Sequence, residues 1–194
     1  LASTGGAKPT GITADLKYHA VKLTSSDSEE LTSRMNFEVL AGLAEDDSKV
    51  NVRKSVLGAA TTRSEDGATI YRTRFVVTAR GEDLLAGCRL VVSYYSRSLT
   101  EKERKRESTE SLLLPSLERG QSYTVDGQGL TLYKASSSTV TTRGAQGMSI
   151  YGKEWYGMML ELQDPEGHAI LKRFSPQSLE RDIERDSSKS AAGI

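Results

Sequence analysis

The chain has 194 residues, and its 26 Lys and Arg residues balance 26 Asp and Glu residues, so the formal net charge at pH 7 is zero. This balance removes the main electrostatic argument for a nucleic-acid partner, and we expect none. No apolar run approaches the roughly 20 residues that a helix needs to cross a bilayer, so the sequence predicts no transmembrane segment.

Strand signals dominate the chain. Apolar and polar residues alternate with the two-residue period of a half-buried strand in segments 35–43, 71–79 and 88–94. Further strands are predicted at 14–24, 50–61, 111–118, 121–126, 130–142, 148–163 and 167–174. Many strands separated by frequent turns predict an all-β fold, either a sandwich or a barrel.

Turn residues interrupt this pattern. Gly, Asp and Pro cluster at 65–67, 80–83, 126–129 and 164–167. The last cluster predicts a hairpin that joins 158–163 to 168–174. The most charged run, 101–107, mixes both signs, and we expect it at the top of a hairpin or in an exposed helical turn.

One short helix is predicted near the C-terminus. Ser175 suits the N-cap and Pro176 the first helical position. Leu179 and Ile183 then fall one turn apart on one face. The pattern predicts a helix over 176–186 that packs on the edge of the strands.

The predicted organisation is a single β-sandwich domain over residues 13–186. Residues 1–12 are expected to be a flexible N-terminal segment and residues 187–194 a flexible tail. The small, polar opening from Leu1 to Gly6 suits a region just after a signal-peptide cut. We therefore expect a periplasmic location or one at the cell surface or outside the cell.

Groups that carry catalysis are scarce. His19 and His168 are isolated on strand-like segments, and Cys88 shares the parity of Leu90 and Val92, as a buried structural thiol would. Nucleophile, phosphate-binding and zinc-site motifs are missing. We therefore predict no catalytic residue, no metal and no cofactor, and a protein that is not an enzyme. The enzymatic alternative is an uncharacterised carboxylate site.

Aromatic residues near the C-terminus supply a candidate contact site. Tyr151, Trp155 and Met159 share one parity and fall on the nominally outer face of their strand, and Tyr95 is a further candidate. An exposed aromatic stripe can stack on a sugar ring or anchor a protein partner.

The same four residues have a structural alternative. The C-terminal helix or an N-terminal segment would cover the stripe, or a bulge at Gly152 or Gly157 would reverse the parity of the strand. The helix residues Leu179 and Ile183 need a surface to pack on, and this stripe offers one.

Three segments carry a family resemblance: Ser33–Leu40, Cys88–Tyr95 and Lys153–Leu162. The chain resembles an immunoglobulin-like antiparallel β-sandwich envelope protein of Akkermansia-type bacteria, associated with a type IV pilus-like gene cluster. The resemblance covers about residues 13–186. It implies a non-catalytic envelope protein with envelope or pilus-assembly proteins as partners, and it supplies no active site.

Three functions follow from these observations. The first is a structural or interaction protein of the cell envelope, as an accessory component of a type IV pilus-like system. The second is a carbohydrate-binding module that uses Trp155 and Tyr151. The third is the carboxylate enzyme. Exposed edge strands often mediate assembly, and the expected edges are 14–24 and 111–118, the latter interrupted by Pro115.

Overall fold

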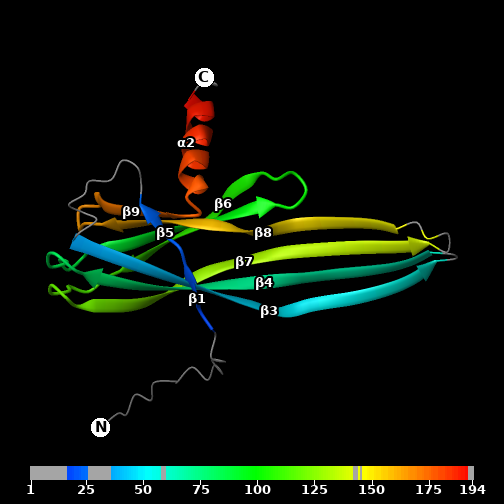
Figure 1. Ribbon diagram of the computed structural model, residues 1–194, viewed down its shortest axis with the longest axis horizontal. Helices are drawn as coiled ribbons and strands as arrows, with labels where there is room; N and C mark the ends of the chain where they lie inside the picture. Colours follow the sequence, from blue (N-terminus) through cyan, green and yellow to red (C-terminus); the bar gives the residue numbers. More distant parts are fainter. Residues whose placement is uncertain (1–16, 26–35, 58–59, 142–143, 145, 192–194) are drawn as a thin grey trace, which may run out of the picture.

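The computed structural model describes residues 17–25, 36–57, 60–141, 144 and 146–191 (Figure 1). The described elements are β1 (His19–Val21), β2 (Thr24–Ser25), β3 (Phe37–Leu57), β4 (Ala60–Ala79), β5 (Arg89–Ser98), β6 (Arg104–Leu113), β7 (Ser122–Thr141), β8 (Gln146–Gln163), β9 (Ala169–Ser175) and α2 (Ser178–Ala191). The fold is all-β, its described strand pairs are antiparallel, and a short helix ends the chain. These features confirm the predicted fold class.

The sheet runs in the order β1-β3-β4-β7-β8-β5-β6, while β9 pairs with β8 and β2 with β9. The sheet curls, so the inward side chains of β3 and β4 pack against those of β5, β8 and β9 in one core. Phe75, Val77, Leu90, Val92 and Leu160 are fully buried there. The predicted alternation is therefore confirmed in these strands, while the immunoglobulin-like arrangement stays a prediction.

Four strands extend beyond this core as a long arm, which points to the right in Figure 1. The arm consists of the second halves of β3 and β7 and the first halves of β4 and β8, paired in the order β3-β4-β7-β8. Segments 35–43 and 50–61, expected as two strands, contribute to one continuous strand, β3, with an irregularity between Asp46 and Lys49.

Two of the predicted turns lie inside strands, so those predictions were wrong. Residues 65–67 are paired on both sides, with β3 and with β7, and this pairing overrides their turn propensity. At 126–129 the chain forms a bulge, because Gln128 and Gly129 together face Arg72 alone. The hairpin at 164–167 is confirmed, with the Asp164 N–H donating to the carbonyl of His168 at 2.9 Å.

Strand β8 belongs to both the arm and the part of the protein that surrounds the core, which we call the body. Its first part, Gln146–Gly152, pairs with β7, and its second part pairs with β5 and β9. Gly152 stands at the change, with φ of 108°. A Cβ at this position would lie 2.2 Å from the carbonyl oxygen of Tyr133, so only glycine allows the close approach.

The edges of the sheet agree with expectation, although the strand bounds do not. β1 and β6 lie at the two ends of the strand order, close to the predicted edges 14–24 and 111–118. The charged run 101–107 forms the end of the β5–β6 hairpin and the start of β6, because pairing with β5 already begins at Arg104.

Helix α2 begins at Ser178, two residues later than predicted, because Ser175 still pairs with Met158 as the last residue of β9. The helix continues to Ala191, beyond the predicted end at 186, and projects away from the strands in Figure 1. Residues 1–16 and 192–194 lie outside the described residues, so the flexible ends stay predictions there.

The first turns of α2 fasten it to the body. Leu179 and Ile183 pack with Tyr95, Phe174 and Met159, which confirms the predicted apolar stripe. A polar cluster of three side chains lies beside this packing. The carboxylate of Asp182 accepts a hydrogen bond from the Tyr156 hydroxyl at 2.6 Å and pairs with Arg104 at 2.6 Å.

Candidate functional site on the arm

Trp155 does not lie on an open outer face. Its ring is partly buried against Tyr71 and Tyr94, with centroids at 5.2 and 5.8 Å. The cause is a register shift in the β5–β8 pairing, where Tyr95 faces Gly157 and Ser96 faces Trp155, so Tyr156 is one extra residue. The bulge reverses the parity of β8. The sequence left such a bulge open at Gly152 or Gly157, and the extra residue lies next to the second of these positions.

The other three predicted contact residues lie in two environments. Tyr95 is 8% exposed, and it and Met159 pack against helix α2. Tyr151 lies on the arm and is 55% exposed. The structure therefore does not bring the four residues together, and Tyr151 is the one among them that solvent reaches freely.

The arm offers two edge strands to solvent. β1 pairs with β3 at residues 41–43, outside the arm, and β5 pairs with β8 from Lys153 onward. In the described part of the chain, this leaves one side of residues 146–151 and one side of residues 49–57 without a neighbouring strand. At Gly152 the carbonyl already accepts a hydrogen bond from the N–H of Leu99 at 3.0 Å. Unpaired N–H and C=O groups on such an edge can hydrogen-bond to a strand from another chain.

The two edges differ in charge. The β3 edge carries Arg53 and Lys54, whereas Gln146–Gly152 contains neither a charged residue nor a proline. Charged side chains and proline are the usual protection of natural edge strands against pairing. The β8 edge lacks this protection.

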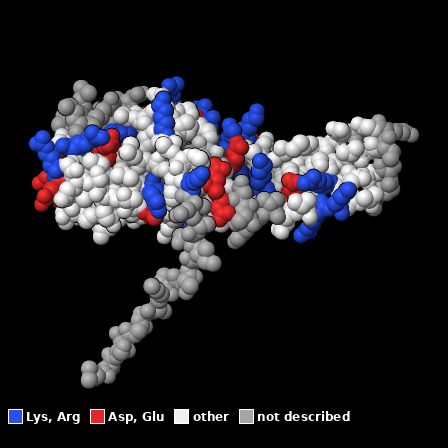
Figure 2. All heavy atoms as spheres, turned by 60° about the horizontal axis from the view of Figure 1, so that its bottom comes forward, with Lys and Arg blue, Asp and Glu red and all other residues white. Residues whose placement is uncertain are grey.

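Exposed apolar side chains gather along the β7–β8 side of the arm. Met148 is 70% exposed and Val140 48%, and the register places both on one face. Much of the arm surface in Figure 2 is uncharged. Its charged residues come mainly from β3 and β4, namely Arg53, Lys54, Arg63, Glu65 and Asp66.

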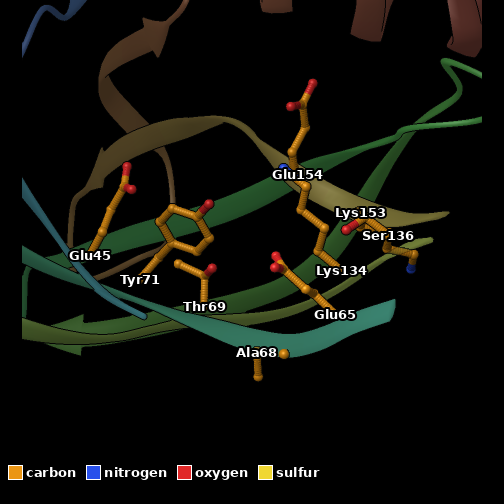
Figure 3. A pocket seen from close by; sticks show the side chains of 10 residues that line it. Glu45, Glu65, Ala68, Thr69, Tyr71, Lys134, Ser136, Lys153 and Glu154 are labelled. Atoms are coloured by element: carbon orange, nitrogen blue, oxygen red, sulfur yellow. The ribbon is translucent and has the colours of Figure 1, made fainter. Parts of the chain in front are cut away.

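A polar hollow of about 380 Å³ lies where the arm meets the body (Figure 3). The carboxylates of Glu45, Glu65 and Glu154 stand at separate corners of this hollow and do not converge on one point. Glu65 pairs with Arg63 at 2.6 Å, and Glu154 pairs with Arg97. General acid–base catalysis by two carboxylates needs both groups within reach of one substrate atom, and this geometry does not favour it.

The remaining reactive groups occupy structural positions. Cys88 is 2% exposed, and burial, followed by the nearby charge of Asp164, raises the pKa of its thiol. His19 and His168 are exposed. Burial of Asp164 acts to raise its pKa, but hydrogen bonds from the backbone and ring of His168 lower it overall. These contacts stabilise the turn at residues 164–167.

Among the described residues, His, Cys, Asp and Glu form no group of three or more that could hold a metal ion. In the same part of the chain, no helix combines the length and apolar character that crossing a membrane requires.

The fold and site define an all-β protein with a projecting four-stranded arm. No family model matches the chain, and no curated protein matches it. One similar solved structure, the X-ray structure of Northeast Structural Genomics Consortium target SoR45, is 10% identical, with a TM-score of 0.26 over 61% of this chain and 84% of that one. A likeness of this size carries no argument for a function.

Proposed function

We propose that the chain is a non-catalytic structural or interaction protein that binds a partner protein by strand addition at the β8 edge of its arm. The observation that carries this proposal is the segment 146–151 of β8. Among the described residues it has no neighbouring strand on one side, and it contains neither a charged residue nor a proline. Proteins that stay monomeric usually protect such an edge, and proteins that assemble use it.

The geometry of the edge gives the binding mode. A partner strand would hydrogen-bond to the outward N–H and C=O groups of β8. Side chains on alternate residues would contact the partner on both faces, with Met148 and Ile150 on one face and Ser149 and Tyr151 on the other. The main chain supplies affinity in this mode, and the alternating side chains supply specificity.

The compartment belongs to the same proposal. We place the protein in the periplasm or at the cell surface, with envelope or pilus-assembly proteins as its partners. The support for this placement is the family resemblance of the sequence. The projecting arm agrees with a role in contacting another protein, since it presents a binding edge at a distance from the core (Figure 1).

Site-specific photo-crosslinking in the native cells tests the proposal. A benzophenone amino acid replaces Ser149 on the β8 edge in one strain and Ser55 on the β3 edge in another. Both serines are exposed, and they lie on opposite edges of the same arm. We expect a discrete crosslinked product from position 149 and none from position 55.

A charge variant makes the test specific. Met148→Lys places a cation on the β8 edge, and Val56→Lys does the same on the β3 edge, where the native side chain is similarly exposed at 67% against 70%. Met148→Lys should abolish the product formed from position 149, whereas Val56→Lys should leave it unchanged. Equal products from both edges, or a product that Met148→Lys does not affect, would refute strand addition at β8.

A further inference from the structure

A second hollow, of about 590 Å³, lies on the opposite face of the arm from the polar hollow of Figure 3. Two tyrosines line it, Tyr133 from β7 and Tyr151 from β8, and they are 72% and 55% exposed. Tyr151 faces Ala135 across the strands, so Tyr133, two residues earlier, is its diagonal neighbour. Diagonal neighbours lie roughly 7–8 Å apart, within reach of two aromatic rings.

The register places polar groups beside these rings. Asn51, Asp66, Ala135 and Tyr151 form one row of partners across the four strands of the arm. Ala68 faces Tyr133 in the neighbouring row. Small side chains therefore form the floor between the tyrosines, while an amide and a carboxylate stand at the β3–β4 side.

This combination matches the chemistry of a sugar ring. A pyranose has an apolar C–H face, which packs on an aromatic ring, and hydroxyl groups, which need amide or carboxylate partners at their edge. A concave surface with aromatic walls and a few polar groups is also the usual form of a small-molecule site.

From this arrangement we infer that the Tyr133–Tyr151 hollow binds a neutral hexopyranose, with the two rings against its C–H face and Asp66 and Asn51 on its hydroxyls. The side chain of Lys134 points to the opposite face, where Figure 3 shows it. Arg53 of β3 stands on the face of the hollow, in the row next to Asn51 and Asp66, and adds a hydrogen-bond donor beside the carboxylate.

The site differs from the one that the sequence suggested. Trp155 was the expected partner of Tyr151, but its ring is held between Tyr71 and Tyr94. Gly152 separates the two positions, and its bend directs β8 from the arm into the body. Tyr133 thus takes the place expected for Trp155. The sugar site shares Tyr151 with the edge proposed for strand addition, but the inference rests on separate observations, the hollow and its polar groups.

Saturation-transfer NMR and calorimetry on the full chain test the inference, with methyl β-D-galactopyranoside and methyl β-D-glucopyranoside as probes. We expect binding of at least one of these neutral glycosides. Tyr133→Ala and Tyr151→Ala should each weaken binding by about tenfold or more. Asp66→Ala should weaken it as well.

Two matched variants serve as controls. Tyr123→Ala removes another exposed tyrosine of β7, in the body, and Met148→Lys changes the opposite face of the arm. Both should bind sugar like the wild type, so a failure of strand addition and a failure of sugar binding can be told apart. No binding of either neutral glycoside, or an equal loss in Tyr123→Ala, would overturn the inference.

Discussion

The hydroxyl of Tyr94 on β5 donates a hydrogen bond to the carboxylate of Glu110 on the neighbouring strand β6, and both groups also contact the facing strands of the curled sheet. The same hydroxyl oxygen lies 2.7 Å from the hydroxyl of Thr73 on β4, while Glu110 accepts a bond from the backbone N–H of Gln128 on β7 at 2.8 Å. Gly127 makes room for the cluster, because a Cβ there would lie 2.4 Å from a Glu110 oxygen. Edge strand β6 is thereby fixed against β7.

Tyr94→Phe tests the contribution of this cluster to stability. The change leaves Thr73 and Glu110 without their shared partner in a largely dry site, where an unsatisfied polar group costs about 1–3 kcal/mol. We expect a loss of that size in the free energy of unfolding, measured by urea denaturation. Tyr123→Phe, on an exposed side chain, should stay close to the wild type. Equal stability of both variants would show that the cluster does not stabilise the fold.

Gly152→Ala tests the bend between arm and body. A Cβ at this position meets the Tyr133 carbonyl at 2.2 Å, and φ of 108° is unfavourable for alanine. We expect a loss of about 2 kcal/mol or more in thermal denaturation, from strain alone. The control is Gly147→Ala on the same strand, where a Cβ would have no neighbour within 4 Å. A tolerated Gly152→Ala would mean that the bend is not fixed by the backbone.

The lowered pKa of Glu107 predicts that the stability of the protein depends on pH. Burial acts to raise the pKa of its carboxyl, but hydrogen bonds from Lys153 and Ser96 outweigh that effect and lower the pKa below its ordinary value of 4.5. The folded state thus favours the ionised form. The contribution of ionised Glu107 to the free energy of unfolding is fully present above the pKa of the unfolded chain. It is lost as the pH falls through the lower pKa of the folded protein.

The measurement compares the wild type with Glu107→Gln by denaturation from about pH 7 to about pH 3. The wild type should be the more stable at neutral pH, and the difference should shrink as the solution becomes acidic. Glu103→Gln, on an exposed side chain, should show no such trend. A difference that is constant with pH, or grows on acidification, would contradict the assigned shift.

Leu179→Ala should release helix α2 from the body. Leu179 is 1% exposed and packs with Tyr95 and Phe174, and removing such a buried leucine usually costs about 2–5 kcal/mol. We expect the amides of α2 to exchange hydrogen faster while those of β4 keep their protection. Arg181→Ala, on an exposed position of the same helix, should leave exchange unchanged. Unaltered protection of α2 in Leu179→Ala would show that other contacts hold the helix.

The sequence predicted the body better than the arm. Alternation at Phe75 and Val77 identified a buried face, because one side of that strand is dry and the other wet. In the arm, neither face of β7 is buried and most side chains at 135–141 are half-buried, so residues 136–141 show no apolar period that could reveal a partner. The length of that run without turn residues is the signal that could have indicated a long strand.

The candidate site could not be predicted from the sequence for a different reason. Parity assigned Trp155 to the outer face, yet the extra residue Tyr156 reverses the parity within the same strand. A bulge depends on the opposing strand, and the sequence of β8 alone does not encode where β5 will pair with it. Tyr133 was missed for a related reason, since its proximity to Tyr151 arises from the β7–β8 register.

Hydrogen exchange along the two arm edges tests strand addition most directly, because it reports the backbone groups that a partner would bind. The purified chain is compared with the chain bound in detergent-solubilised envelope from its own cells. The account predicts that amides within residues 147–151 of β8 become protected, while those at 51–55 of β3 do not. Unchanged exchange at 147–151, or equal protection of both edges, would contradict it.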